Sequence, residues 1–282
     1  MMNHAPDLTI TPDDLAQFSA YFHRQSGIWF DDSKRYFLEK RLQDRIRIQR
    51  APNFAGWFRQ LRGDTQGLEF QAVVNAMTVN ETYFFREAYQ FDCLVNHLMN
   101  EVRARKAPGE TIRIWSVPSS TGEEPYSIAI YLLERWRHIN EVDVEILSSD
   151  IDTQVLAAAQ TGVYSRRSVG ELPANLLRKY FKPVGNDEFE ISRDLVDAVE
   201  FSRVNLCKPA ETRNFRNIDI VFCRNLLIYF DDESRDTALQ ALHASLNPQG
   251  FLCLGHSESI GHGPKGFEMR RFPDALIYQK KA

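Results

Sequence analysis

The amino-acid sequence predicts an α/β protein in which helices precede a mostly parallel, doubly wound β-sheet. Residues 1 to about 90 carry apolar residues at helical spacing. From Ile112 onward, short apolar strands alternate with helices, and the chain ends on two segments typical of an antiparallel pair. Alternating strands and helices favour a parallel sheet, because parallel neighbours need a crossover connection between them.

The composition is that of an ordinary globular protein. The 282 residues are 43% hydrophobic and 26% charged, and the net charge of −4 gives no general argument for nucleic-acid binding. The cysteines Cys93, Cys207, Cys223 and Cys253 are far apart, so they indicate neither a zinc site nor a disulfide framework. Free thiols fit a reducing cytoplasm, and no apolar run approaches the ~18 residues of a membrane span. We therefore expect a cytoplasmic protein with no metal, no nucleic-acid partner and no membrane insertion.

The N-terminal region predicts four helices. The first begins at Thr11, where a capping residue is followed by a proline and two acids. The second covers residues 34–50, and two shorter helices follow at 53–61 and 69–77. We therefore expect an N-terminal helical domain at residues 1–78.

The second of these helices is strongly basic. Seven of its residues are basic, and only Glu39 and Asp44 are acidic. Its apolar stripe consists of Leu38, Leu42 and Ile46, and the basic residues along one edge of that stripe are Lys34, Arg41 and Arg45. One interpretation is a solvated basic face. The other is a surface that binds an acidic helical partner or phosphates.

Residues 80–87 (NETYFFRE) do not follow a simple amphipathic period, because two phenylalanines and an arginine lie beside polar residues. One interpretation is a linker between helices that is packed by its aromatic side chains. The other is the wall of a pocket, with the Arg86 guanidinium directed at an anion. A helix at 91–105 then leads into the sheet, so the linker and this helix are expected at 79–105.

The stretch 112–134 (IRIWSVPSSTGEEPYSIAIYLLE) predicts a strand, a small-residue loop and a helix, which together open a nucleotide-binding sheet. Such a loop brings backbone N–H groups and a helix N-terminus to the carboxyl end of the strand. Thr121 and Glu124 have the spacing of a capping box. The loop has a single glycine and is not the G-x-G-x-x-G fingerprint, so an ordinary capped helix is the alternative.

Asp150 follows the second predicted strand, at 142–149. An acid at this place in a nucleotide-binding sheet typically accepts hydrogen bonds from ribose hydroxyls. The alternative is that Asp150 or Asp152 only caps the next helix, and Asp152 is the better candidate for that role.

The remaining elements complete the sheet. A helix at 172–181 precedes a small β insertion at 183–201. A buried strand at 218–223 ends at Arg224 and Asn225, where polar side chains of a parallel strand lie over the ligand crevice. The last elements are a helix at 231–246, a strand at 251–254 and an antiparallel pair at 269–272 and 275–278, joined at Pro273 and Asp274. We interpret His256 as a loop or packing residue in preference to a catalytic base.

Six motifs occur in an order that resembles one known family. They are NETYFFRE at 80–87, WSVPSSTGEEPYSIA at 115–129, SDIDTQVLAAAQTGVY at 149–164, VEFSRVNL at 199–206, DIVFCRNLLIYFD at 219–231 and GFLCLGHSES at 250–259. On these motifs the chain is similar to the CheR-type chemotaxis receptor methyltransferases, which are S-adenosylmethionine-dependent protein-glutamate O-methyltransferases. The likeness covers nearly the whole chain.

The resemblance implies a fold and an activity. The fold is an N-terminal all-helical domain followed by a Rossmann-like class I methyltransferase domain at 106–282, with a small antiparallel β subdomain inserted at about 181–203. The activity is methyl transfer from S-adenosylmethionine to glutamate side chains of methyl-accepting chemoreceptor cytoplasmic helices in bacterial chemotaxis, which leaves S-adenosylhomocysteine. We expect a cytoplasmic monomer.

The resemblance also implies roles for individual positions. Cofactor contacts are implied for Asn80, Thr82, Arg86, Glu124, Asp150, Asn205, Leu206, Arg224 and Asn225. Among them, Glu124 would meet the methionine portion of the cofactor and Asp150 its ribose. Arg86 and Tyr229 would orient the substrate carboxylate. The basic helix, with Lys34, Arg41 and Arg45, would bind the acidic methylation region of the receptor.

The chain differs from the family pattern at two places, and two other functions stay open as alternatives. The family usually has other small residues where this chain has Val117 and Pro118, which affects the backbone of the cofactor loop. Some members bind a short receptor tail on the β subdomain, whose hairpin is compact here. The alternatives are a methyltransferase for another substrate and a non-catalytic module that senses S-adenosylmethionine.

Overall fold

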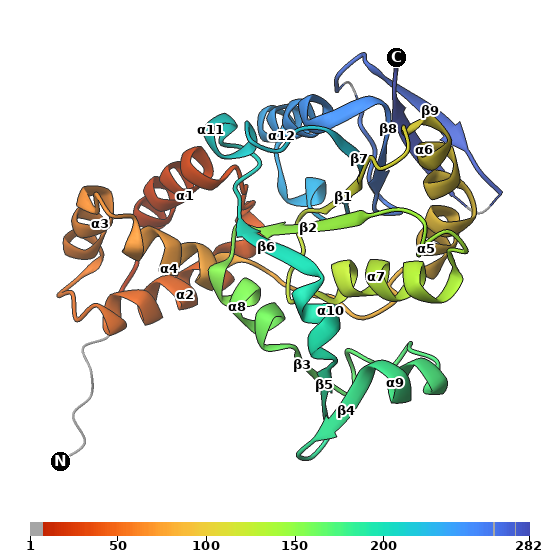
Figure 1. The fold of residues 1–282 in the computed structure, drawn as a ribbon. Helices are drawn as coiled ribbons and strands as arrows, with labels where there is room; N and C mark the ends of the chain where they lie inside the picture. Colours follow the sequence, from red (N-terminus) through yellow and green to blue (C-terminus); the bar gives the residue numbers. More distant parts are fainter. Residues whose placement is uncertain (1–7, 262, 274) are drawn as a thin grey trace. The chain divides into compact units, whose positions relative to one another are not determined.

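The computed structural model of this chain describes residues 8–261, 263–273 and 275–282 (Figure 1). The chain divides into two compact units. The first contains the residues up to Val79 together with the segment Tyr229–Ser234, and the second contains Asn80–Ile228 and Arg235–Ala282. Nothing in the sequence predicted that Tyr229–Ser234 would group with the N-terminal region.

The first unit is helical, as predicted. Its N-terminal elements are α1 (Pro12–Ser26), the short 3₁₀ helix η1 (Asp32–Lys34), α2 (Arg35–Ile48), α3 (Phe54–Gly63) and α4 (Leu68–Met77). Thr11 begins α1 with a complete capping box, because its hydroxyl accepts a hydrogen bond from the Asp14 N–H and its own N–H donates to the Asp14 carboxylate. The predicted apolar stripe of α2 is buried. Phe18, Phe22 and Trp57 are fully buried in this unit.

The second unit is built on a seven-stranded sheet with the order β6-β2-β1-β7-β8-β10-β9. Its strands are β1 (Ile112–Ser116), β2 (Val144–Asp150), β6 (Val199–Arg203), β7 (Ile218–Cys223), β8 (Leu246–Leu254), β9 (Phe267–Arg271) and β10 (Leu276–Lys280). The first five pair in parallel, and β10 runs antiparallel to both β8 and β9. The predicted doubly wound sheet with an antiparallel ending is therefore confirmed, although Asp274, which was expected in the last turn, lies outside the described residues.

The order of the strands reverses at β1, because the chain leaves β1 for β2 on one side and later returns to β7 on the other. In open α/β sheets, ligands bind beyond the carboxyl ends of the strands at such a switch point. β1 pairs with β2 on one side and with β7 on the other, and Ile114 is in register with Ile146 and Ile220. All three of these side chains are buried.

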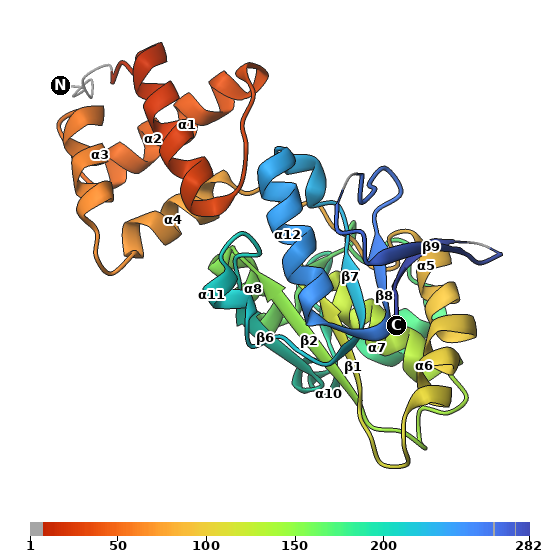
Figure 2. The ribbon, with the colours of Figure 1, turned by 90° about the horizontal axis from the view of Figure 1, so that it is seen from above.

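Helices cover both faces of this sheet. In Figures 1 and 2, α7 (Glu123–Arg135) and α12 (Asp232–Ser245) lie on opposite faces. The lead-in helix begins at Ala88 and continues through a π turn, so that α5 (Ala88–Cys93), η2 (Leu94–Leu98) and α6 (Met99–Arg105) follow without a break, and α5 and η2 pack on α7. The other helical elements are α8 (Thr153–Thr161), α9 (Ala174–Tyr180), α10 (Arg193–Asp197), α11 (Pro209–Thr212) and η3 (Leu227–Tyr229).

The inserted β subdomain differs from its expected range of 181–203. Its three strands are β3 (Val163–Ser165), β5 (Glu188–Ile191) and β4 (Phe181–Val184), in that order across the sheet. The last part of the expected range is the helix α10 and the strand β6, and β6 belongs to the main sheet, where it pairs with β2. The strand β3 was missed because only three residues of it pair, and they pair only with β5.

Among the described residues, no helix has both the length and the apolar character needed to cross a membrane.

Candidate active site

The loop between β1 and α7 is fastened to the end of β2 by two backbone amides. The Ser119 N–H donates to the Ser149 carbonyl at 2.9 Å, and the Ser120 N–H donates to Asp150 Oδ2 at 2.8 Å. Within the described residues, the hydroxyls of Ser119 and Ser120 are buried without a hydrogen-bond partner. Buried polar groups normally have one, so these two hydroxyls are candidates for hydrogen bonds to a polar ligand.

Gly122 begins α7, and its position requires glycine. Its φ is +94°, and a Cβ there would lie 2.8 Å from Tyr126 Cε2. The capping box predicted from Thr121 and Glu124 is wrong, because the N-cap is Gly122 and α7 has no side-chain cap. Glu124 is directed instead at the strand ends, where its Oε1 accepts a hydrogen bond from the Ser116 hydroxyl at 2.8 Å.

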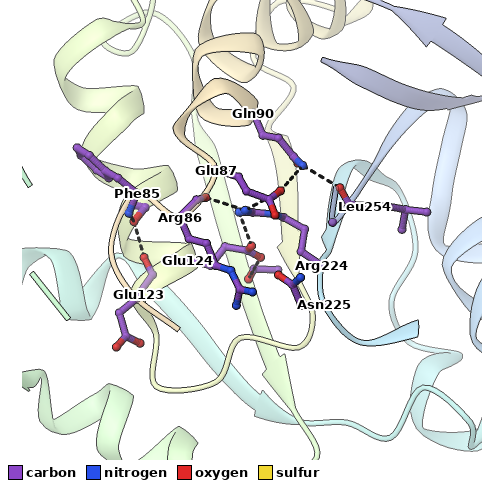
Figure 3. A network of polar contacts seen from close by, with 12 residues as sticks. Phe85, Arg86, Glu87, Gln90, Glu123, Glu124, Arg224, Asn225 and Leu254 are labelled. Atoms are coloured by element: carbon purple, nitrogen blue, oxygen red, sulfur yellow. Dashed lines mark hydrogen bonds and ion pairs between the residues drawn. The ribbon is translucent and has the colours of Figure 1, made fainter. Parts of the chain in front are cut away.

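Arg224 lies between Glu87 and Glu124, and we call these three residues the Arg224 cluster (Figure 3). The Arg224 side chain is only 2% exposed. Its Nη1 lies 3.0 Å from Glu124 Oε2, and its Nη2 lies 3.1 Å from Glu87 Oε2. Nη2 also donates to the Arg86 carbonyl at 2.6 Å, and the guanidinium carbon lies 5.5 Å from the centre of the Phe91 ring. The residue that follows β7 therefore connects the linker with α7.

The two carboxylates of the Arg224 cluster respond differently to burial. Burial raises the pKa of Glu124, and the positive charge of Arg224 only partly opposes this. Burial also acts to raise the pKa of Glu87, but Arg224 and hydrogen bonds from His256 and Tyr89 together lower it below its usual value. When both carboxylates are ionised, the cluster has one positive and two negative charges, so it favours a cationic ligand.

Asp150 lies at the end of β2 and is only 3% exposed. Its two carboxylate oxygens accept hydrogen bonds from the Ser120 N–H and the Asp152 N–H, at 2.8 and 2.9 Å. Burial raises the pKa of Asp150 to about 6, although these backbone hydrogen bonds oppose the shift. At neutral pH the side chain is therefore an ionised acceptor at the carboxyl end of β2.

Asp152 is the N-cap of α8, as predicted. Its Oδ1 accepts hydrogen bonds from the N–H groups of Gln154 and Val155. Its Oδ2 accepts one from the Asn80 amide at 2.9 Å. The first residue of the NETYFFRE motif is thereby bonded to the N-cap of α8, which lies 72 residues further along the chain.

Asn205 and Leu206 follow β6, and both are buried. The segment is joined to β2 because the Val204 N–H donates to the Asp150 carbonyl at 2.9 Å. The Asn205 side-chain oxygen accepts a hydrogen bond from the Cys207 N–H at 2.9 Å. These two residues thus lie next to Asp150, as expected for neighbours at the carboxyl ends of adjacent parallel strands.

Arg86 and Thr82 lie in the linker, and both are half-buried. The Arg86 guanidinium donates to the Glu81 carbonyl at 2.8 Å and lies 5.9 Å from the centre of the Tyr83 ring. In Figure 3 the carbonyl oxygen of Arg86 is turned toward the Arg224 guanidinium. The side chain of Arg86 is therefore separate from the Arg224 cluster, which contacts only its backbone.

Two family models match this chain. The S-adenosylmethionine-binding domain of CheR methyltransferases matches residues 80–275, and the all-alpha domain of CheR methyltransferases matches residues 13–78. The chain belongs to the CheR methyltransferase family. It therefore has the cofactor-binding domain of an S-adenosylmethionine-dependent methyltransferase, in the Rossmann-like fold described above.

Curated relatives match this CheR-family chain over most of their length. Chemotaxis protein methyltransferase 2 of Vibrio cholerae is 46% identical, over 97% of this chain and 95% of the relative. A chemotaxis protein methyltransferase of Vibrio parahaemolyticus is 35% identical, over 97% of this chain and 99% of the relative. Chemotaxis protein methyltransferase 2 of Pseudomonas aeruginosa is 36% identical, over 89% of this chain and 88% of the relative.

Tyr229 of the CheR-family chain belongs to the first compact unit. Its carbonyl accepts a hydrogen bond from the Trp29 N–H at 2.9 Å, and the next residue, Phe230, forms an antiparallel bridge with Ile28. The residue is exposed, at 37%. The other predicted catalytic and cofactor-binding residues belong to the second unit, so Tyr229 is held by a different part of the chain from Arg86.

The three basic residues expected at a docking surface differ in their surroundings. Lys34 and Arg41 are exposed. Arg45 is only 14% exposed and is ion-paired with Glu69, whose carboxylate also accepts a hydrogen bond from the Trp57 indole at 2.8 Å. Lys34, at the end of η1, and Arg41 therefore remain exposed candidates for the docking surface, whereas Arg45 contributes to the helical unit itself.

Two acidic residues of the CheR-family site were missed in the sequence. Glu87 is the last residue of the NETYFFRE motif, and it pairs with Arg224, which lies 137 residues further along the chain (224 minus 87). Glu258 accepts hydrogen bonds from three backbone N–H groups near the ends of β7 and β8. The signal was present, since both residues lie in motifs that carried the family resemblance, but the spacing gave no indication of their partners.

Proposed function

We propose that this chain transfers a methyl group from S-adenosylmethionine to glutamate side chains of chemoreceptor cytoplasmic helices, forming glutamate methyl esters during chemotactic adaptation. The observation that carries the proposal is the presence of both CheR domains, in order, in one chain that spans nearly the full length of its relatives. Those relatives are named chemotaxis protein methyltransferases. The protein would act in the cytoplasm as a monomer.

The crevice residues suit a cofactor with positive charge. S-Adenosylmethionine has a sulfonium centre and an ammonium group, and the Arg224 cluster places two carboxylates around one guanidinium. The buried hydroxyls of Ser119 and Ser120 are further polar groups for a ligand. We assign cofactor contacts to Asn80, Thr82, Arg86, Glu124, Asp150, Asn205, Leu206, Arg224 and Asn225.

The proposed reaction needs orientation more than acid–base chemistry. When bound, S-adenosylmethionine supplies an electrophilic methyl group on its sulfonium sulfur. A glutamate side chain has an ordinary pKa of about 4.3, so it is ionised at neutral pH and needs no general base. The chain must align this carboxylate and exclude water, and alignment contributes as much as about 7–11 kcal/mol in favourable cases. We assign the alignment to the Arg86 guanidinium and the Tyr229 hydroxyl.

The direct test is transfer of a radiolabelled methyl group from S-adenosylmethionine to purified receptor cytoplasmic fragments. We expect the label to enter the fragment and to be released by alkali, because a glutamate methyl ester is alkali-labile. A fragment with glutamine in place of its candidate glutamates should accept no label. Label that survives alkali would contradict ester formation. Cofactor binding without transfer to any receptor fragment would favour the sensing module.

We expect cofactor affinity to fall at acid pH if Asp150 binds the ribose. The pKa of Asp150 is about 6, and only the ionised carboxylate accepts both ribose hydrogen bonds. The dissociation constant of S-adenosylhomocysteine should therefore be flat near pH 7 and rise about tenfold per pH unit below pH 6. Calorimetric titration between pH 5 and 7.5 measures this dependence. Asp150→Asn should bind S-adenosylhomocysteine at least about tenfold more weakly at pH 7, and its affinity should no longer fall at acid pH. If the affinity of this variant depends on pH as in the wild type, the acid dependence belongs to a group other than Asp150.

Reversing charge at Lys34 and Arg41 should reduce receptor methylation about tenfold in kcat/KM while leaving cofactor affinity unchanged, because exposed complementary charges act mainly on encounter. Both residues are exposed, and Arg41 lies 4.9 Å from the centre of the Phe37 ring. The variant is Lys34→Glu with Arg41→Glu, assayed at two salt concentrations.

The matched control for this variant reverses Arg59 and Arg62, which are exposed on α3. It changes the net charge by the same amount on another helix of the same unit. An equal loss in both double variants would show that net charge, and not the surface around Lys34 and Arg41, governs the rate.

A further inference from the structure

Glu258 accepts three backbone hydrogen bonds where two neighbouring strands end. Its Oε2 accepts from the Asn225 N–H at 2.7 Å and from the Gly255 N–H at 2.9 Å, and its Oε1 accepts from the Leu227 N–H at 2.7 Å. Gly255 follows β8, and the other two donors follow β7. One carboxylate thus joins the carboxyl ends of adjacent parallel strands.

The backbone around this carboxylate is specialised. Asn225 has a φ of +57°, in the left-handed region that most residues avoid. A Cβ at Gly255 would lie 2.8 Å from Glu258 Oε2 and 3.1 Å from the Asn225 nitrogen. Any larger residue at position 255 would therefore push the carboxylate away from the amides that it binds. The close approach of the Asn225 backbone, Gly255 and Glu258 therefore depends on the missing side chain of Gly255 and on the Glu258 carboxylate.

This arrangement directly adjoins the Arg224 cluster. Arg224 is the residue before Asn225, and its guanidinium reaches Glu124 and the Arg86 carbonyl. A change in the backbone of Asn225 would move the origin of the Arg224 side chain, because the two residues share a peptide bond. The Asn225 backbone therefore influences both proposed cofactor residues on this segment.

We infer that Glu258 is a positioning residue for the methyl-transfer site. Its carboxylate holds the segment after β7 in the backbone conformation from which Arg224 and Asn225 meet the cofactor. The inference rests on the proposed cofactor roles of Arg224 and Asn225, and it is independent of the identity of the methyl acceptor. Glu258 acts through these two residues and through backbone amides.

Because Glu258 accepts from three N–H donors, its positioning role predicts a specific order of effects for two substitutions. A glutamine side chain has the size of glutamate, but its NH₂ group is a donor. In either orientation that NH₂ would face at least one backbone N–H, because both glutamate oxygens are occupied as acceptors. Glu258→Gln should therefore disturb the segment at least as much as Glu258→Ala. A residue that only fills space would give the opposite order, with glutamine close to the wild type.

The experiment is calorimetric titration of S-adenosylhomocysteine into the wild-type protein, Glu258→Gln and Glu258→Ala. We expect both variants to raise the dissociation constant at least tenfold, with glutamine no better than alanine. Turnover at saturating S-adenosylmethionine should fall less than the affinity does. Glu268→Gln, which makes the same chemical change at an exposed position on β9, is the control and should bind normally. Binding by Glu258→Gln within twofold of the wild type would overturn the inference.

Two further measurements separate this inference from the proposed cofactor contacts. Asn225→Gly removes the side chain and suits the left-handed φ. If Asn225→Gly binds normally while Glu258→Gln binds weakly, the Asn225 contact fails and the positioning role stands through Arg224. If Asn225→Gly binds weakly and Glu258→Gln normally, the positioning role alone fails.

Hydrogen exchange of the wild-type protein tests the same contacts without any substitution, so it applies even if the Glu258 variants do not fold. The amides of Asn225, Leu227 and Gly255 should exchange at least 100-fold more slowly than unprotected amides, because each donates a hydrogen bond to the Glu258 carboxylate. Exchange of these amides at the rate of an unstructured peptide would overturn the inference.

Discussion

Replacing Arg224 with methionine should lower the free energy of unfolding by about 3–5 kcal/mol, the cost of removing one partner from a buried ion pair. Methionine retains much of the length of arginine, so the loss reports charge more than volume. The carboxylates of Glu87 and Glu124, each 12% exposed, would lose their shared cation, and the Arg86 carbonyl would lose its donor. Urea unfolding followed by circular dichroism measures the change.

The control for this prediction also removes the two carboxylate charges that are left without a cation. Adding Glu87→Gln and Glu124→Gln to Arg224→Met should recover part of the lost stability, because neutral amides are less costly to bury than unpaired carboxylates. The triple variant should still bind the cofactor poorly. If it is no more stable than Arg224→Met alone, the ion pairs are not the reason for the loss.

Replacing Arg86 with alanine should lower turnover about 100-fold, which is much more than it weakens cofactor affinity. The Arg86 guanidinium contacts the Glu81 carbonyl and the Tyr83 ring, and the Arg224 cluster uses only the Arg86 backbone, which alanine retains. Loss of a donor that acts on the reacting group typically reduces the rate by a factor of this size. Single-turnover methylation of a receptor fragment and calorimetry with S-adenosylhomocysteine separate the two quantities.

Arg86→Lys is the matched control. It preserves the charge but removes the planar, bidentate donor set, so it should recover only part of the rate. Wild-type turnover in Arg86→Ala would exclude Arg86 from the orientation of the substrate carboxylate.

The alternation of strands and helices was predictable because it depends on local patterns. Apolar runs such as Ile218–Cys223 are buried at every position, as a strand covered on both faces requires. The acid at the end of β2 and the cap at Asp152 were likewise visible, since each depends on its neighbours in the chain. The cap of α7 was not, because the left-handed backbone of Gly122 takes the place of the side-chain cap expected from Thr121.

Features that depend on distant partners were not predictable. The helical spacing placed Arg45 on an edge of α2, but only the fold reveals that Glu69 neutralises it. The sequence of β6 looked like part of the β insertion until its pairing with β2 was known. Glu258 lies 33 residues after Asn225, and no spacing rule links a carboxylate to backbone amides of another strand.

The segment Tyr229–Ser234 belongs to the N-terminal helical unit, although it lies about 150 residues after the rest of that unit in the sequence. Its backbone pairs with Ile28 and Trp29, and the Asp231 carboxylate lies 3.1 Å from His23 Nε2. The helical region is thus completed by a few residues encoded far downstream. A chimera that exchanges the first 79 residues between two family members would separate these partners, so residues 229–234 must be exchanged with them. Recombination within such genes is expected to respect this pairing, and substitutions at the two places are expected to vary together.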